Sequence, residues 1–241
     1  MLAEALRVTI LFLMTNHIYK FDGSIRRQTK GGPIGLEITG DLAQILMIWY
    51  DEHLKTRLIR EGQILLLYKR YVDDINMGIK NQWKHLGDRE KCEMKAAEMV
   101  EAEGNSIHKS TEITVDAPYR HQDRKLPMLD IKAWTEERVN ENGTTKTIIL
   151  HEFYAKEVSA KSITHARSAM PAAMKRTVLT QELLRVMLRC SPLLEWEVTV
   201  EHLNTMMKRI QYSGYGQAYR AQILKSALSA YDTIKEKDKN G

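Results

Sequence analysis

Residues 63–79, which read QILLLYKRYVDDINMGI, decide the fold of this chain. A strand-like segment over Gln63–Tyr71, apolar from Ile64 to Tyr68, is followed by Val-Asp-Asp at positions 72–74 and then by a second short run, Ile75–Ile79. Strand-forming residues on both sides of a short polar bend are typical of a β-hairpin. The sequence therefore predicts a hairpin with two adjacent carboxylates at its turn.

The two carboxylates belong to Asp73 and Asp74. Like charges a few ångströms apart repel each other, and a divalent cation removes that cost. Mg²⁺ takes hard oxygen ligands, commonly one or two carboxylates together with water and substrate phosphates. The alternative is a solvated turn, which is the usual explanation of an isolated Asp-Asp pair. Here apolar strands flank the pair, and Tyr71 lies on the same strand face as Asp73, so the sequence favours a metal site.

Upstream of the hairpin, a glycine-rich loop leads into an apolar segment. Residues 28–35 read QTKGGPIG, and Leu36–Leu54 is rich in Leu, Ile, Ala and Met. Such a loop lets the backbone approach a substrate closely, and N–H groups at a helix start favour an anion. A purely structural loop with a proline turn is the alternative. Apolar residues on all sides of the following segment predict a buried helix. Residues 1–20 predict another helix, which ends before the turn signal Asp22-Gly23.

Downstream of the hairpin, the pattern predicts a helix and a second hairpin. Residues 88–103 are amphipathic, with Asp88 as the N-cap. Strands are expected over Leu126–Trp134 and Thr147–Tyr154, and Asn142-Gly143 between them is a dipeptide that favours positive φ in a hairpin.

The last third of the chain predicts three helices. The first begins at Pro171, the second covers 198–211, and the third covers 217–235, with a frayed charged tail after it. One apolar stripe of the first helix contains Leu179, Leu183, Val186, Met187 and Cys190. The whole order of elements indicates an α+β domain followed by a helical region.

Composition narrows the class of protein without defining its function. The chain has 241 residues and a formal net charge of +5, which by itself does not establish nucleic-acid binding, because only clustered cations release many counterions. Its longest apolar runs, Val8–Met14 and Ile45–Tyr50, are too short to cross a bilayer, so we expect no membrane association. Two cysteines, Cys92 and Cys190, provide neither a disulfide framework nor a zinc motif, which indicates a reducing intracellular compartment.

The glycine loop and the acidic hairpin, in this order, resemble the reverse transcriptase family. Tyr-x-Asp-Asp at 71–74 is that family's catalytic hairpin, and Gln-x-x-Gly-x-x-x-Gly at 28–35 is its preceding motif. The resemblance covers roughly residues 15–190 and is greatest to Penelope-type retroelements. Its further matches are Asn105–Lys109, Leu126–Ile131 and Phe153–Lys156, followed by Ser168 and Pro171.

The resemblance implies an α+β fold of the right-hand polymerase type. Residues 1–165 would be a partial palm, an antiparallel sheet with helices on one face. Residues 166–238 would be an α-helical thumb, and residues 239–241 a frayed tail. The implied activity is RNA-templated DNA synthesis with Mg²⁺ or Mn²⁺ held by Asp73 and Asp74. The implied partners are an RNA template, a DNA primer duplex and deoxynucleoside triphosphates, and the implied location is the nucleus.

The resemblance also assigns residue roles. Lys109 would donate a proton to the leaving pyrophosphate, with an exposed surface lysine as the alternative. The residues that would line the nucleotide and template pocket are Gln28, Gly31, Gly32, Pro33, Gly35, Tyr71 and Val72. The residues that would contact the primer–template duplex, unless they are plain helix or strand surface, are Lys132, Lys156, Lys175, Arg176, Arg185 and Arg189.

One catalytic element of the family is missing from the sequence. Reverse transcriptases need a third carboxylate from a strand upstream of the glycine loop, and the acids before Gln28 are Glu4 and Asp22, neither in a predicted strand. The chain alone is therefore expected to be a fragment with little or no polymerase activity. Two alternatives stay open. One is a non-catalytic palm–thumb module that binds nucleic acid, and the other is an RNA-templated RNA polymerase, whose hairpin usually has glycine in place of Val72.

Overall fold

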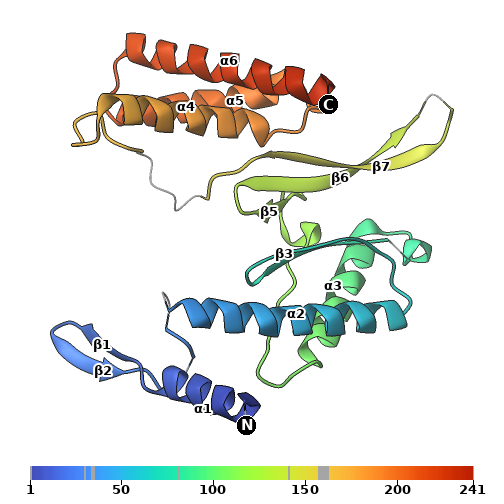
Figure 1. The fold of residues 1–241 in the computed structure, drawn as a ribbon. Coiled ribbons are helices and arrows are strands. Elements are labelled where there is room, and N and C mark those ends of the chain that lie inside the picture. The colour runs from blue at the N-terminus through green and yellow to red at the C-terminus, as the bar shows by residue number, and fades with distance from the viewer. Residues whose placement is uncertain are drawn as a thin grey trace. The chain divides into compact units, whose positions relative to one another are not determined.

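The computed structural model describes residues 2–29, 31–33, 36–80, 82–140, 142–156 and 163–240. They belong to two compact units, Met1–Val115 and Asp116–Gly241. Both units contain helices and small antiparallel sheets, and in the second unit the sheet precedes three helices, which confirms the expected α+β class. In this division the sheet that follows residue 115 groups with the three C-terminal helices (Figure 1).

The first unit begins with a helix and a short ribbon. Helix α1 covers Leu2–Thr15, and strands β1 (Ile18–Phe21) and β2 (Ser24–Arg27) form an antiparallel pair. Asp22 and Gly23 join them with φ angles of 48° and 74°, the pattern of a type I′ hairpin turn. The turn signal was correct. The helix expected over residues 1–20 ends at Thr15. The sequence did not reveal the two strands after it, because their side chains are all exposed and show no alternation of buried and exposed positions.

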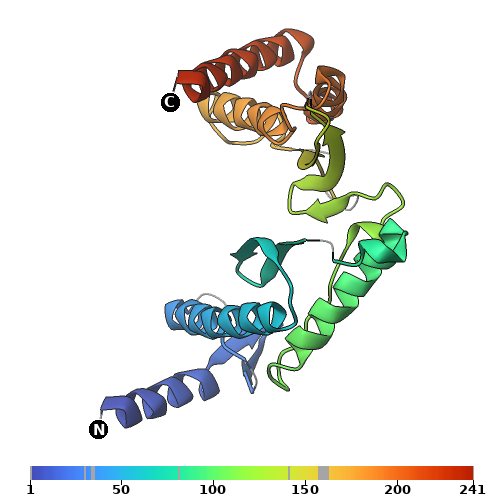
Figure 2. The same ribbon diagram turned by 90° about the vertical axis from the view of Figure 1, so that its right-hand side faces the viewer.

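The central hairpin of the first unit packs against one long helix. Helix α2 covers Glu37–Arg60, and strands β3 (Leu65–Tyr71) and β4 (Asp74–Ile79) form an antiparallel two-stranded sheet (Figures 1 and 2). The core of the unit contains Tyr50, Leu54 and Leu58 of α2 and Val100, with Leu65, Tyr68, Ile75, Met77 and Ile79 of the hairpin packed against them.

The expectation that α2 is buried on all sides was wrong for the described chain. Its buried residues form one stripe at every fourth position, from Tyr50 to Leu58. Ile45 is 64% exposed and Leu46 is 56% exposed. The sequence of α2 contains more apolar residues than the single hairpin and helix beside it can cover.

A third helix completes the first unit. A short 3₁₀ turn, η1 (Lys84–Leu86), precedes α3, which covers Arg89–Asn105. The carboxylate of Asp88 accepts a hydrogen bond from the backbone N–H of Glu90 at 2.9 Å, which confirms the predicted N-cap. Gly104 lies so close to α2 that a Cβ atom there would be 2.8 Å from the hydroxyl of Tyr50, so a glycine lets the helices pack together.

The second unit contains a three-stranded antiparallel sheet. After the 3₁₀ turn η2 (Pro118–Arg120), strands β5 (Leu126–Met128), β6 (Ile131–Val139) and β7 (Thr145–Phe153) pair in the order β5-β6-β7. The single strand expected over residues 126–134 is broken by a turn, in which Leu129 has a φ of 55°. Gly143, with a φ of 73°, lies in the β6–β7 connection, as the Asn-Gly signal predicted.

Three helices follow the sheet and form most of the core of the second unit. They are α4 (Ala172–Leu188), α5 (Trp196–Tyr212) and α6 (Gln217–Asn240). The predicted stripe of α4 is confirmed, since Leu179, Leu183 and Val186 are each 0% exposed. Helix α6 continues to Asn240, beyond the helix end that the sequence predicted at residue 235. None of the described helices is long and apolar enough to span a bilayer.

Candidate functional site

The acidic pair lies at the tip of the β3–β4 hairpin, as the sequence predicted. Tyr71 and Asp74 are opposite each other in the ladder, and Val72 and Asp73 form the two-residue turn between them. Both aspartates are exposed. Val72 has a φ of 56°, which places a β-branched residue in the left-handed region. The turn therefore presents two carboxylates to solvent from an unusual backbone conformation.

A hydrogen-bonded network connects this turn to helix α2. Nη1 of Arg70 donates to the carbonyl oxygen of Val72 at 2.7 Å and to Oε1 of Gln44 at 3.1 Å. Nε of Arg70 donates to Oδ2 of Asp51 at 2.8 Å, and the phenol of Tyr68 donates to Oδ1 of the same carboxylate at 2.7 Å. Burial, followed by the hydrogen bond to Asp51, raises the pKa of Tyr68, so its phenol stays protonated. Both oxygens of Asp51 thus hold strand β3 on the helix.

The glycine loop lies directly before α2. Gly31 has a φ of 73°, and a Cβ atom there would be 3.7 Å from the side-chain nitrogen of Gln28. At Gly32 a Cβ atom would collide with Cγ2 of Thr39 and would be 2.8 Å from Cε of Met14, so a larger residue would require these side chains to shift. Pro33 is buried. Gly35 lies outside the described residues, as do Lys30 and Ile34.

The hairpin turn and the glycine loop lie toward the same end of α2. Gln44, which contacts Arg70, comes two helical turns after Glu37, the first residue of the helix. At a rise of about 1.5 Å per residue, this separation is roughly 10 Å along the helix axis. The open end of the hairpin lies at the other end of α2, where the N–H of Gln63 bonds to the carbonyl of Leu58 at 2.9 Å. The structure therefore brings the two sequence motifs toward one end of a helix.

The acidic turn fits an incomplete Mg²⁺ site. Two exposed neighbouring carboxylates match a cation that takes one or two protein carboxylates and fills its shell with water and phosphate oxygens. Within the described residues there is no group of three or more His, Cys, Asp or Glu side chains that could enclose a metal ion. Lys109 lies in the exposed turn after α3, and the ring of its neighbour His108 is 6.5 Å from that of Trp49 on α2.

Most of the cations expected on the thumb are engaged within the second unit. Arg185 and Arg189 converge on one carboxylate, with Nη1 of Arg185 at 3.3 Å and Nε of Arg189 at 3.1 Å from Oδ2 of Asp130. The ammonium group of Lys175 donates to the carbonyls of Ala166 and Ser168, each at 2.7 Å. Arg176 is exposed on α4. Asp130 therefore connects the β5–β6 turn to helix α4 and the residue after it. The sequence identified this residue only as part of the Leu-Pro-x-Leu-Asp motif.

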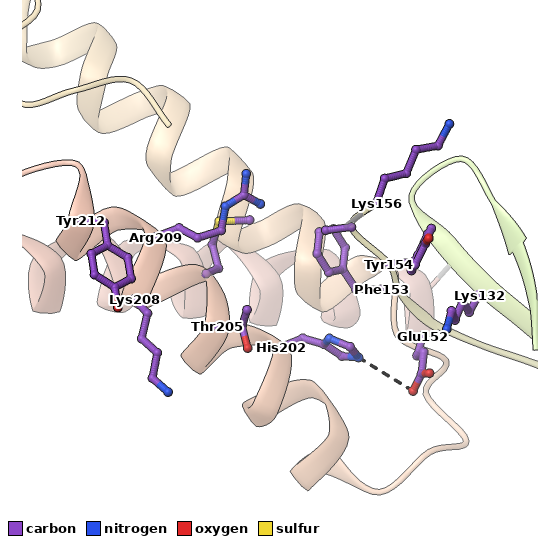
Figure 3. Close-up of a pocket in the computed structure, with 12 residues that line it drawn as sticks. Lys132, Glu152, Phe153, Tyr154, Lys156, His202, Thr205, Lys208, Arg209 and Tyr212 are labelled. Carbon is purple, nitrogen blue, oxygen red and sulfur yellow. Dashed lines mark ion pairs between the residues drawn. The ribbon is translucent and has the colours of Figure 1, made fainter. Parts of the chain in front are cut away.

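A cavity of about 460 Å³ opens between the end of β7 and helix α5 (Figure 3). Cationic and aromatic side chains from separate segments surround it, together with Ala155, Thr205 and Met206. The basic ones are Lys132, Lys156, His202, Lys208 and Arg209, the aromatic ones are Phe153, Tyr154 and Tyr212, and the one acid is Glu152.

The acids in and beside this cavity are already neutralised. Glu152 accepts a hydrogen bond from Lys125 at 2.7 Å and lies 3.8 Å from His202, and these partners, His202 foremost, lower the pKa of its carboxyl. Lys132 pairs with Asp123 at 2.5 Å. Lys156 and Lys208 are exposed at the rim. The cavity therefore combines positive charge with aromatic faces, the chemistry that suits phosphates and bases.

The sequence alone could not reveal this cavity, because its residues come from β6, from the end of β7 and from α5, which are separate segments of the chain. Lys132 and Lys156 were predicted from the resemblance, whereas His202 and Tyr212 were missed. A comparison of the chain with models of protein families, with curated proteins and with solved structures found no match.

Proposed function

We propose that this chain is a reverse transcriptase segment, the later part of a polymerase palm followed by a thumb, that serves RNA-templated DNA synthesis. One observation carries the proposal: a β-hairpin presents Asp73 and Asp74 at its turn, toward the end of α2 into which the glycine loop leads. A solvated turn needs neither a glycine loop before the same helix nor the network of largely buried side chains that Arg70 and Asp51 form behind the turn. The valine at position 72 favours a reverse transcriptase over an RNA-templated RNA polymerase, whose hairpin usually has glycine there.

The proposed roles follow from the position of each side chain. Asp73 and Asp74 would hold a divalent cation, which supplies charge neutralisation for nucleotidyl transfer when it is bound. Tyr71 and Val72 are 63% exposed and would lie against the primer terminus and the incoming nucleotide. Gln28 and the glycines beside it would line the template and nucleotide pocket, where the backbone can approach closely. Lys109 would donate a proton to the leaving group.

In the second unit, the cavity between β7 and α5 would contact the nucleic-acid backbone. Lys156 and Lys208 would face phosphates, and Tyr154 and Tyr212 offer aromatic faces for bases. Lys132 contacts Asp123 and the ring of Tyr154 in the free protein, so a phosphate would compete with Asp123 for its ammonium group. Arg185, Arg189 and Lys175 would act indirectly, because their charged groups hold the sheet and the loop before α4.

Binding of Mn²⁺, measured by electron paramagnetic resonance of the free ion, tests the metal site. We expect Asp73→Asn and Asp74→Asn each to weaken binding about tenfold or more, since each removes a charged ligand. Asp22→Asn is the matched control, because Asp22 is also an exposed aspartate in a two-residue hairpin turn of the same unit. Equal Mn²⁺ affinity in all three variants would refute the metal site.

Primer extension on an RNA template with Mg²⁺ tests the reaction itself. Whatever incorporation the chain supports should be lost in Asp73→Asn and retained in Asp22→Asn. Incorporation that survives Asp73→Asn would contradict the assignment of this residue.

A non-catalytic module that binds nucleic acid is the second candidate, and the cationic and aromatic cavity favours it. This candidate needs no metal at the hairpin turn. It predicts that the affinity for a primer–template duplex is the same in the intact chain and in Asp73→Asn, with and without Mg²⁺. A metal-dependent gain in affinity that requires Asp73 would exclude it.

A further inference from the structure

The backbone of the acidic turn is held in a conformation that its sequence disfavours. Val72 has a φ of 56°, and the left-handed region is unfavourable for an L-residue, most of all when the residue is β-branched. Such a conformation persists only where the surrounding structure holds it in place. The side chain of Val72 is 63% exposed, so burial of that side chain is not what holds it.

The side chain of Arg70 contacts the backbone of this turn directly. Its Nη1 donates to the carbonyl oxygen of Val72 at 2.7 Å, while its Nε donates to Asp51 at 2.8 Å. The side chains of Arg70 and Asp51 are only 8% and 13% exposed. A guanidinium group is planar, so a carboxylate that fixes one edge also fixes the direction of the N–H groups on the other. Tyr68 and Gln44 hold Asp51 and Arg70 in turn.

We propose that Arg70, fixed by Asp51 of α2, is a positioning residue that keeps the Val72 peptide in the left-handed turn and so sets the direction of Asp73 and Asp74. The positioning itself concerns the backbone and stands without any ligand. Its consequence for metal affinity rests on the proposed function.

A role through charge alone makes the opposite prediction for the metal. A cation near a carboxylate pair opposes the binding of a divalent ion, so its removal would tighten Mn²⁺ binding. Loss of a positioning group weakens binding instead, by about 10–100-fold for side chains that orient metal ligands. The direction of the change therefore separates the two roles.

The backbone test uses the full chain labelled with ¹⁵N-valine. A residue with a positive φ shows an intense intraresidue cross-relaxation signal between its amide and α protons, because those protons come close together. We expect an intense Val72 signal in the intact chain and a weak one in Arg70→Met and in Arg70→Lys. The lysine variant keeps the charge but lacks the planar fork that reaches both partners. Arg60→Met is the control, because Arg60 is 69% exposed on the same helix as Asp51.

Asp51→Asn is a second variant, which keeps the proposal testable if the Arg70 variants fail to fold. An asparagine still accepts the hydrogen bond of Tyr68 but attracts Arg70 less, so the Val72 signal should weaken while the other valine signals keep their positions. An unchanged Val72 signal in folded Arg70→Met or Arg70→Lys overturns the proposal.

The Mn²⁺ affinity of the same variants completes the experiment. We expect a loss of about 10–100-fold in Arg70→Met and in Arg70→Lys, and a change within about twofold in Arg60→Met. Tighter binding in Arg70→Met overturns the positioning role in favour of charge. If the intact chain itself binds no Mn²⁺ through Asp73, the proposed function fails, and the Val72 signal still decides whether Arg70 positions the turn.

Discussion

At the scale of single residues, the acidic turn shows a conflict between local preference and tertiary structure. Valine favours extended backbone, yet Val72 occupies the left-handed region beside two aspartates. The sequence could predict that a turn lies at residues 72–74, because apolar runs flank the bend. It could not predict the sign of φ at Val72, because that depends on a contact with Arg70 and, through it, on Asp51 of another element.

Replacement of Val72 by glycine should stabilise the first unit. Relief of a left-handed β-branched residue returns roughly 1–2 kcal/mol, and the extra freedom of glycine in the unfolded chain costs about 0.5–1 kcal/mol. The expected net gain is about 0.5–1 kcal/mol in the free energy of unfolding, measured with urea. Val139→Gly is the control, because Val139 is 70% exposed at the end of β6 and its loss should destabilise. A loss of stability in Val72→Gly would show that the turn is unstrained.

Glu152 should give the second unit a dependence on acid pH. His202, foremost, and Lys125 lower the pKa of this carboxyl below its ordinary value of 4.5. The stability that its ionised form contributes is therefore complete above about pH 4.5 and is lost as the pH falls through the lowered pKa. In Glu152→Gln, the free energy of unfolding should fall less steeply with decreasing pH below this value. Glu137→Gln, an exposed position on the neighbouring strand, should keep the steeper fall of the unaltered chain.

At the scale of elements, the periodicity of the sequence predicted which helix faces are buried, but it missed a pair of strands and a pair of ionic contacts. The apolar stripe of α4 and the acidic N-cap of α3 are local signals, and both were correct. The β1–β2 ribbon was missed, because four-residue strands with exposed side chains carry no burial pattern. The inward role of Arg185 and Arg189 was also missed. It depends on Asp130, which belongs to a turn that is distant in the sequence.

Helix α4 should contribute most of its stabilisation through its apolar stripe. Leu183 is 0% exposed, and its replacement by alanine should lower the free energy of unfolding of the second unit by about 2–5 kcal/mol. Leu188→Ala, at a position that is 40% exposed on the same helix, should cost less than about 1 kcal/mol. Urea unfolding followed by circular dichroism measures both. Similar losses in the two variants would mean that α4 is not packed by this face.

At the scale of the whole molecule, positive charge matters where it is concentrated. The net charge of +5 is modest, but the cavity between β7 and α5 gathers five basic side chains around a single neutralised acid. Composition gave the total charge and could not give this local concentration, because strands and a helix from different parts of the sequence assemble it. The two units differ in this respect, since the acidic turn belongs to the first and the cationic cavity to the second.

The salt dependence of nucleic-acid binding tests this concentration. Each phosphate contact on a single strand contributes about 0.7 to the slope of log K against log salt. The double variant Lys156→Gln with Lys208→Gln should therefore lower the slope for an oligonucleotide by roughly 1.4. The control, Lys91→Gln with Lys95→Gln on α3, changes the net charge equally at two exposed positions of the first unit and should leave the slope unchanged. Equal slopes in the two double variants would show that binding depends on overall charge alone.

The phenol behind the acidic turn gives the hairpin a spectroscopic label. Because Tyr68 is half-buried and donates to Asp51, its ionisation would place two negative charges against each other. In an alkaline titration followed by near-ultraviolet absorbance, Tyr68 should give a late change, because it should ionise only as the hairpin separates from α2. Replacement of Tyr68 by phenylalanine should remove that late, slow step, so that the release of β3 can be timed without any added probe.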